Sequence, residues 1–247
     1  RELGAATAVH RNRIAGPAPE ATLLERHHGA TLDLLHGRAR SHEYDAVHER
    51  CVVFVDRRYW IVGDALRAPT PHDYRLNFQL SAMAEGRVRL DSHGASHRAR
   101  SPGLLLLQPA RHGVQAAVRP GWVSASYGEK QAAPALQFDA HGGDVDFDSV
   151  LVPWLHDEPA VEVDQVLVVP ARAGTARSAL RIRHSLGGQT VIDHWFHAPS
   201  TVTEAWNVGD LAFEARWAFW RLDAAGRLLH AVSHDGARLP RLQAQPA

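Results

Sequence analysis

The chain has 247 residues, 45% hydrophobic and 22% charged, an ordinary globular mixture that can bury a core without disulfides. Its 27 Lys and Arg residues balance 27 Asp and Glu residues, which argues against a nucleic-acid partner. The sequence has no apolar run long enough to span a membrane and no apolar signal-peptide centre in its charged first segment, and its single cysteine, Cys51, is expected to be a small buried hydrophobe. We therefore expect neither a membrane nor a nucleic acid as a partner.

The first strong local pattern is a hairpin. Two apolar, β-prone runs, 51–55 and 59–62, flank the polar turn 56–58. Further along, in the segment 73–81 (DYRLNFQLS), apolar and polar residues alternate strictly, which predicts a half-buried strand. In that strand a row of polar residues is expected on the solvent-facing side: Arg75, Asn77 and Gln79.

Two more hairpins are predicted in the C-terminal part. The runs 178–186 and 190–198 are separated by a Gly-Gly-Gln turn, and the runs 211–222 and 227–234 by Asp-Ala-Ala-Gly. Four tryptophans in these strands are expected in the core: Trp195, Trp206, Trp217 and Trp220. With about a dozen or more short strands along the chain, the fold class is predicted to be all-β, an antiparallel multi-strand β-sandwich of stacked sheets with little or no helix.

The two-proline segment 151–160 (LVPWLHDEPA) marks a junction between sheet layers. We expect one domain, with a β-sandwich over residues 1–155, a continuing sheet layer of the same domain over 156–247, and a frayed tail at 238–247.

Four motifs occur in a fixed order along the first part of the chain. They are His48-Glu49-Arg50, the segment 59–64 (YWIVGD), His72-Asp73-Tyr74, and an apolar segment 150–153 that ends in proline. Over about residues 5–155 this ordered set resembles the C-terminal β-domain of the heparinase II/III-like polysaccharide lyases. His48, Asp64 and Tyr74 match family landmarks for which we expect structural roles, with Asp64 accepting backbone hydrogen bonds at the hairpin end.

The resemblance also gives His10 a candidate role. The segment 5–18 (AATAVHRNRIAGPA) is similar to a family segment in which a histidine precedes Asn-Thr, although Arg11 stands here where Asn is usual. In some members that histidine binds zinc together with a His and an Asp from an upstream strand. His10 is thus a candidate zinc ligand that needs ligands outside this segment, since a tetrahedral site takes several protein donors. The alternative is a histidine that only hydrogen-bonds within a strand or loop.

The resemblance further implies a function. Family members cleave acidic, uronate-containing polysaccharides by β-elimination, which requires neutralisation of a carboxylate, a base and an acid. They carry these groups mainly in a helical toroid that precedes the β-domain, so the resemblance implies a toroid of the same protein as partner, no catalytic residue in this segment, and no activity of the segment alone. Such lyases usually meet their substrates in the periplasm or outside the cell.

Binding chemistry within the chain is open to more than one interpretation. The row of Arg75, Asn77 and Gln79 is a candidate substrate-binding array for an acidic sugar, or simply a solvated strand face. His93 and His97 lie in a segment that we interpret as a solvated loop rather than a zinc site. The sequence contains none of the common nucleotide-binding or hydrolase motifs. The rival to the lyase hypothesis is a non-catalytic carbohydrate-binding or structural β-sandwich, and a degenerate lyase that has lost its reaction is a third reading.

Overall fold

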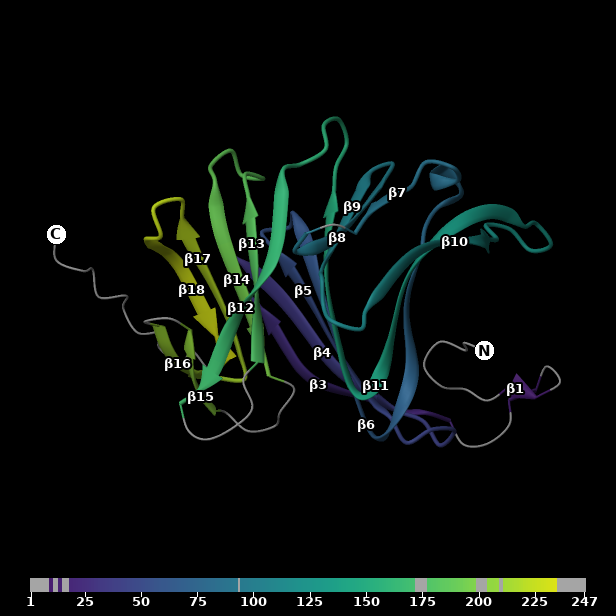
Figure 1. Cartoon of the computed structure of the whole chain (residues 1–247), viewed down its shortest axis with the longest axis horizontal. Helices are drawn as coiled ribbons and strands as arrows, with labels where there is room; N and C mark the ends of the chain where they lie inside the picture. The colour runs from purple at the N-terminus through teal and green to yellow at the C-terminus, as the bar shows by residue number, and fades with distance from the viewer. Residues whose placement is uncertain are drawn as a thin grey trace. The chain divides into compact units, whose positions relative to one another are not determined.

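The computed structural model describes residues 9–10, 13–14, 18–92, 94–171, 177–198, 204–208 and 211–234. Within these ranges the only helical element is a short 3-10 turn, η1 (Ala82–Ala84), and every sheet pairing is antiparallel, which confirms the predicted all-β class (Figure 1). No helix in the described part of the chain is long and apolar enough to cross a membrane.

The chain divides into two compact units, Arg1–Asp157 and Glu158–Ala247. The division falls inside the proline-containing segment 151–160 where the sequence predicts a junction. The expectation that the second unit is a further layer of the same domain stays a prediction, and each unit is described by itself.

The first unit contains a two-stranded ribbon and a nine-stranded sheet. In the ribbon, β1 (Val9–His10) pairs with β2 (Arg13–Ile14). The sheet has the order β3-β4-β5-β6-β11-β9-β8-β7, and β10 also pairs with β11. Its strands are β3 (Glu20–His28), β4 (Leu32–Arg40), β5 (Val47–Val55), β6 (Tyr59–Gln79), β7 (Arg89–Asp91), β8 (Ser96–Ser101), β9 (Leu104–Pro109), β10 (Gln115–Val123) and β11 (Gln131–Pro153).

The predicted hairpin at residues 51–62 is formed by β5 and β6. Asp56 and Arg57 adopt positive φ angles of 47° and 55°, the backbone geometry of the tight turns that match the twist of two antiparallel strands. The amide of Asp56 donates to the carbonyl of Thr31 at 2.7 Å, which fixes the turn against the neighbouring loop. Cys51 lies in this hairpin and is 1% exposed, as predicted for a small buried hydrophobe.

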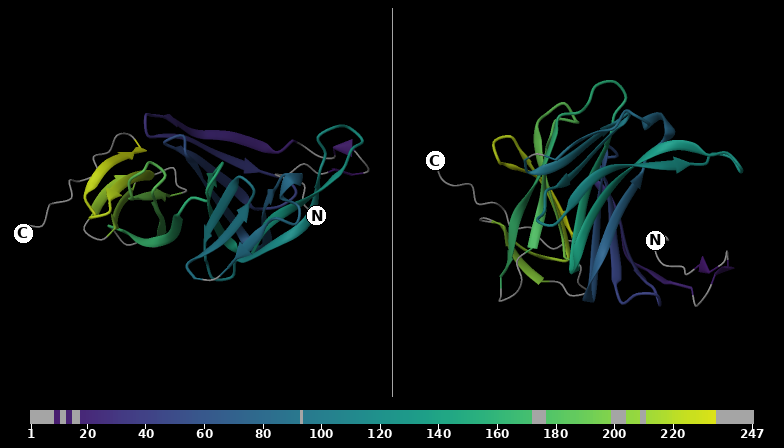
Figure 2. Two further views of the ribbon diagram at one scale, coloured as in Figure 1. Left: turned by 90° about the horizontal axis from the view of Figure 1, so that it is seen from above. Right: turned by 45° about the vertical axis from the view of Figure 1, so that its right-hand side comes forward.

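Two long strands, β6 and β11, pair along nearly their whole length and organise the unit. The second edge of β11 is shared: its first half pairs with β10 and its last residues pair with β9. A register shift between Gly142 and Asp144 separates the two halves. Beyond it, residues 72–79 of β6, 131–142 of β11 and 115–123 of β10 form a three-stranded extension, here called the arm (Figure 2).

One face of the arm is held by the core of the first unit. Leu76 and Phe138 pack with Ala99 of β8, Leu106 of β9 and Phe147 of β11 in one buried cluster. Phe78 meets Phe138 edge to face, with ring centroids 6.3 Å apart. The apolar side of the alternating segment 73–81 therefore faces the core, as the sequence predicts.

The second unit is a seven-stranded sheet with the order β16-β15-β12-β13-β14-β17-β18. Its strands are β12 (Val161–Pro170), β13 (Arg177–His184), β14 (Val191–His197), β15 (Glu204–Val208), β16 (Leu211–Ala215), β17 (Trp217–Asp223) and β18 (Leu228–Ser233). Both predicted hairpins are present, and their turns contain Gly188 and Gly226 with φ angles of 85° and 83°.

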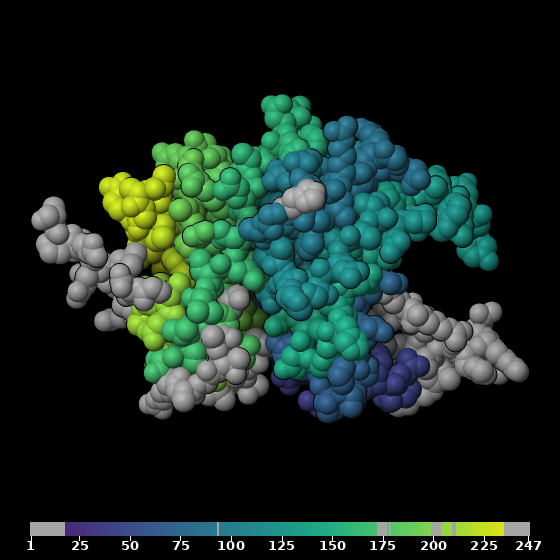
Figure 3. Space-filling model, viewed as in Figure 1, coloured from purple at the N-terminus to yellow at the C-terminus, as the bar shows by residue number. Residues whose placement is uncertain are grey.

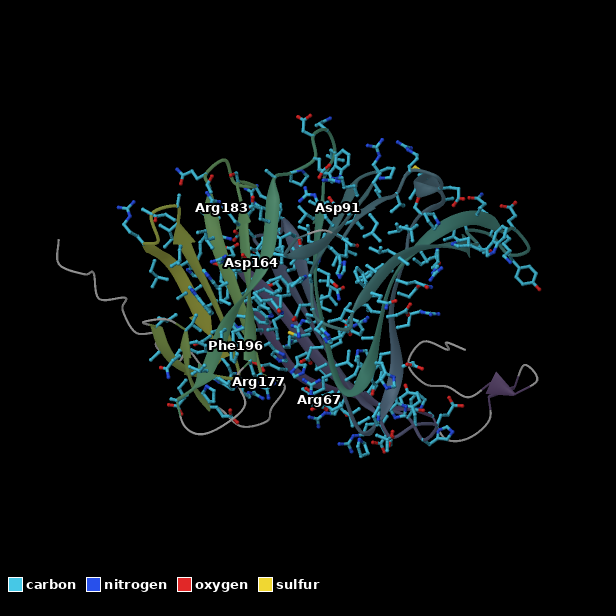
Figure 4. All side chains as sticks on the ribbon, in the orientation of Figure 1. Arg67, Asp91, Asp164, Arg177, Arg183 and Phe196 are labelled. Atoms are coloured by element: carbon cyan, nitrogen blue, oxygen red, sulfur yellow. The ribbon has the colours of Figure 1, made fainter. Side chains whose placement is uncertain are left out.

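The core of the second unit is aromatic. Phe196, labelled in Figure 4, contacts Trp206 and Phe213 with ring centroids 4.9 Å and 5.3 Å away. All four tryptophans predicted to be core residues are at most 3% exposed. These rings, rather than a disulfide, stabilise the sheet by burying apolar area.

Candidate functional site

The predicted polar row lies on the exposed face of the arm. Arg75, Asn77 and Gln79 are exposed, whereas Leu76 between them is 7% exposed. Register with β11 places Arg75 opposite Asp139 and Asn77 opposite Gln137. Because directly opposed residues share a sheet face, the row extends across two strands as a ladder of polar pairs.

Hydrogen bonds join the side chains of the opposed residues in this ladder. Arg75 Nε donates to Asp139 Oδ1 at 2.6 Å, and Gln137 Nε2 donates to Asn77 Oδ1 at 3.0 Å. One step further, His141 Nδ1 lies 2.8 Å from Asp73 Oδ1. These pairs are exposed, so each contributes about 0–1 kcal/mol to stability and can exchange its partner for a ligand at small cost.

Gln79 differs from the other two members of the row. Its Nε2 donates to the carbonyl oxygens of Leu80, Ala133 and Pro134 at 3.3, 3.4 and 3.1 Å. The side chain crosses Gly121, where an added Cβ would lie 3.1 Å from Gln79 Oε1 and 2.9 Å from the Ala133 carbonyl oxygen. Gln79 therefore joins the end of β6 to β11 close to Gly121 of β10, and Arg75 and Asn77 are the better candidates for contact with a ligand.

A second polar group lies where β6 bends. His72 Nε2 lies 2.5 Å from Asp45 Oδ1, and Thr70 Oγ1 donates to Asp45 Oδ2 at 3.1 Å. The hydrogen bond with His72 lowers the pKa of Asp45. The ring of Tyr74 lies 5.9 Å from that of His72, and its hydroxyl group is buried with no hydrogen-bond partner among the described residues.

The surroundings of Tyr74 determine the protonation state of its hydroxyl group. Burial, followed by the charges of Asp45 and Asp144, raises the pKa of Tyr74 above its usual value of 10.0. At neutral pH the phenol keeps its proton, and its burial keeps the hydroxyl away from a polymer on the surface. The structural role expected for Tyr74 stays a prediction, which the burial of its hydroxyl group supports.

The other landmarks, His48 and Asp64, meet inside the same sheet. Asp64 Oδ1 accepts hydrogen bonds from His48 Nε2 and from Arg50 Nε, both at 2.6 Å, and the Asp64 side chain is 2% exposed. Asp64 stands opposite Arg50 within paired strands rather than at a hairpin end. The partners of its carboxylate are these side chains rather than the backbone groups that the sequence analysis expects.

The described residues do not form a metal centre. They contain no group of three or more His, Cys, Asp or Glu side chains that could hold a metal ion. The backbone of His10 belongs to β1, but its side chain lies outside the described part of the chain, and His93 lies outside it altogether. The described residues therefore do not fit a zinc site by themselves, and the zinc role of His10 stays a prediction.

The loop interpretation of His97 is wrong. His97 lies in β8, is 8% exposed, and packs 5.9 Å from the ring of Phe138. Neither of its ring nitrogens has a hydrogen-bond partner among the residues that the structure describes, and burial lowers the pKa of the imidazole. The serines and glycine before His97 led to the loop interpretation. Buried and partly buried residues alternate along β8, which is the pattern of a strand with one face in the core.

Sequence reasoning also missed the residues that complete the polar ladder. Asp139, Gln137 and His141 come from a strand about sixty residues after β6, and their pairing depends on a long-range register that local patterns do not contain. Trp122 and Lys130 near the end of the arm also pack against each other, a contact that no local sequence pattern indicates.

Comparisons with known proteins agree with this architecture. The family model described as "Heparinase II/III-like, C-terminal" matches residues 5–184. Heparan sulfate lyase HepC from Pedobacter heparinus is similar in structure, with a TM-score of 0.52 and 19% identity over 66% of this chain and 26% of that one. A heparinase III structure gives a TM-score of 0.52 and 15% identity over 70% of this chain and 26% of that one.

These matches differ in what they establish. At such low identity the solved structures support the fold alone, and this chain spans about a quarter of their length. No curated protein sequence matches the chain. The family model, however, covers well over half of the chain, including the whole described sheet of the first unit. The chain therefore belongs to the heparinase II/III-like family and contains its C-terminal region.

Proposed function

We propose that this chain is the C-terminal β-portion of a polysaccharide lyase that cleaves an acidic, uronate-containing polysaccharide by β-elimination. The observation that carries the proposal is the family match over residues 5–184. The similarity to proteins named heparan sulfate lyase and heparinase III supports a glycosaminoglycan as the substrate class.

In this proposal the groups that move protons lie upstream, in a helical toroid of the same protein. Elimination needs a base at the carbon beside the uronate carboxylate, an acid at the leaving oxygen, and a group that neutralises the carboxylate. Among the described residues, the Tyr74 hydroxyl group is buried and is not presented to a polymer, and His72 Nε2 is paired with Asp45. These environments support a positioning and binding role for this portion rather than a complete catalytic set.

The polar ladder of the arm is the proposed contact with the chain of sugars. An Arg guanidinium forms charge-assisted hydrogen bonds with carboxylate and sulfate groups, and Arg75 is held on the exposed face by Asp139. Arg75→Ala is expected to weaken binding of heparan sulfate oligosaccharides several-fold. Arg89→Ala, which removes an exposed arginine of β7 in the same unit, is the matched control and should leave the affinity unchanged.

Product formation tests the function. The full-length protein, incubated with heparan sulfate, should generate the ultraviolet absorbance of a 4,5-unsaturated uronate, whereas the present chain alone should generate none. Saccharide binding by the full-length protein without any unsaturated product would instead favour a non-catalytic carbohydrate-binding module.

The zinc role of His10 has a separate test that does not depend on activity. If His10 is a ligand completed by upstream residues, His10→Ala in the full-length protein should lower the zinc content measured by elemental analysis. An unchanged zinc content would end that hypothesis.

A further inference from the structure

The end of the arm exposes an aromatic and cationic group that the polar ladder does not include. Trp122 at the end of β10 is 57% exposed, and Tyr127 in the connecting turn is fully exposed. Lys130 Nζ lies 4.3 Å from the centroid of the Trp122 ring. In the space-filling view the arm extends away from the rest of the first unit, so this group, here called the arm tip, is presented to solvent (Figure 3).

The arm tip has a defined geometry. The turn between β10 and β11 contains Gly128 with a φ of 81°, the amide of Glu129 donates to the Ser126 carbonyl at 3.1 Å, and Ser124 Oγ donates to the same carbonyl at 2.7 Å. Trp122 stands opposite Ala132, which has a small side chain, and the indole stays 57% exposed beside Lys130. The turn is therefore ordered by its own hydrogen bonds, and the contact between Trp122 and Lys130 brings the ring and the ammonium group together before any ligand arrives.

Two features argue for a ligand rather than chance. An exposed tryptophan at the end of a projecting hairpin contributes little to the core, since its apolar area stays in water. Lys130, the single lysine of the sequence, places its ammonium group 4.3 Å from the centroid of that exposed ring. A compact ammonium group beside an indole combines a flat apolar surface with a positive point charge.

We infer that the arm tip binds an anionic sugar unit, with the pyranose ring stacked on Trp122 and its carboxylate or sulfate group paired with Lys130. The inference rests on the proposed function for its choice of ligand. It adds a binding site that lies on the opposite face of the arm from Arg75, because Trp122 and Arg119 are three residues apart in one strand and Arg119 stands in line with Gln79 across β11. Together the two faces would let the arm hold the polymer beyond the units that are cleaved.

The single lysine makes the test direct. Reductive methylation with ¹³C-formaldehyde labels Lys130 and the chain's terminal amine, and it preserves the positive charge. The Lys130 methyl signal, identified by its loss in Lys130→Gln, should be shifted upfield by the Trp122 ring and should lose that shift in Trp122→Ala. Addition of a sulfated heparan sulfate oligosaccharide should move the signal in a saturable way, whereas a neutral dextran oligosaccharide should not.

The second part of the test measures the affinity of the protein for the sulfated oligosaccharide. Trp122→Ala is expected to weaken oligosaccharide binding about tenfold. Leu155→Ala is the control, because it removes a side chain that is 91% exposed in the same unit, and it should leave the affinity unchanged. A Lys130 signal unmoved by the sulfated oligosaccharide, or an equal response to the neutral one, would overturn the inference.

The full-length protein separates this site from the alternatives. If another part of the protein covered the arm tip, Lys130 would resist methylation without any sugar, and the inference would be wrong. If the Lys130 signal does not respond to the sulfated oligosaccharide but the full-length protein still forms unsaturated product, the binding site is rejected and the proposed function stands. If the oligosaccharide binds saturably at the arm tip but the full-length protein forms no unsaturated product, the binding site stands and the lyase function is rejected.

Discussion

Replacement of Glu49 by glutamine should remove a large, pH-dependent part of the stability of the first unit. The Glu49 side chain is 11% exposed within β5. Its Oε2 lies 3.0 Å from His36 Nε2, and its Oε1 accepts from Arg38 Nε and Nη2 at 2.8 and 2.6 Å. A carboxylate so buried and so fully paired is difficult to protonate without loss of the fold.

The magnitude follows from the pKa. Burial by itself would raise the pKa of Glu49, but the hydrogen bonds and charges of His36 and Arg38 outweigh it and lower the pKa from 4.5 to about 2. At about 1.4 kcal/mol per pKa unit this difference corresponds to about 3 kcal/mol of unfolding free energy. Between these two values the unfolded chain binds more protons, so the contribution is complete above pH 4.5 and is lost as the pH falls towards 2.

Urea denaturation across a pH series measures this effect. Wild-type stability should fall steeply below pH 4.5, and Glu49→Gln should be about 3 kcal/mol less stable at pH 7 while the difference narrows in acid. Glu85→Gln, at an exposed position of the same unit, is the control and should change stability by less than about 0.5 kcal/mol. Equal pH profiles for wild type and Glu49→Gln would refute the reasoning.

Three further changes test other parts of the structure. Asp193→Asn should destabilise the second unit by about 3–5 kcal/mol in thermal unfolding, because the fully buried carboxylate pairs with both His184 and Arg221. His97→Leu should flatten the loss of stability on acidification below pH 6.5, since burial lowers the pKa of His97 and the unfolded chain takes up its proton more readily. Gly121→Ala should cost about 1–3 kcal/mol and reduce hydrogen-exchange protection of the arm, because its Cβ would lie 2.9 Å from a backbone oxygen, whereas Gly187→Ala, with open space around it, should not.

Much of the fold was predictable because local patterns encode it. The turn at Asp56, the glycines at positions 188 and 226 and the alternation around Leu76 each specify a strand or a hairpin without reference to distant residues. The four core tryptophans followed from the same alternation. Where composition misled, as at His97, neighbouring glycine and serine indicated a loop, although packing against Phe138 stabilises a strand.

The candidate site was only half predictable. The polar row on β6 could be read from one segment, but its partners on β11 depend on a register between strands that are far apart in sequence. The hydrogen bonds of Gln79 to the carbonyl oxygens of Ala133 and Pro134, and its close approach to Gly121, are likewise long-range contacts. The arm tip was missed because an exposed tryptophan and a buried one look the same in a short apolar segment.

Mass spectrometry of the oligosaccharides that the full-length protein releases from heparan sulfate is the most direct test of the central claim. β-Elimination predicts products whose non-reducing ends are lighter by one water than those of hydrolysis, and no products from the present chain alone. Products that have gained water, or an intact polymer after incubation with the full-length protein, would contradict the assignment of this chain to a working lyase.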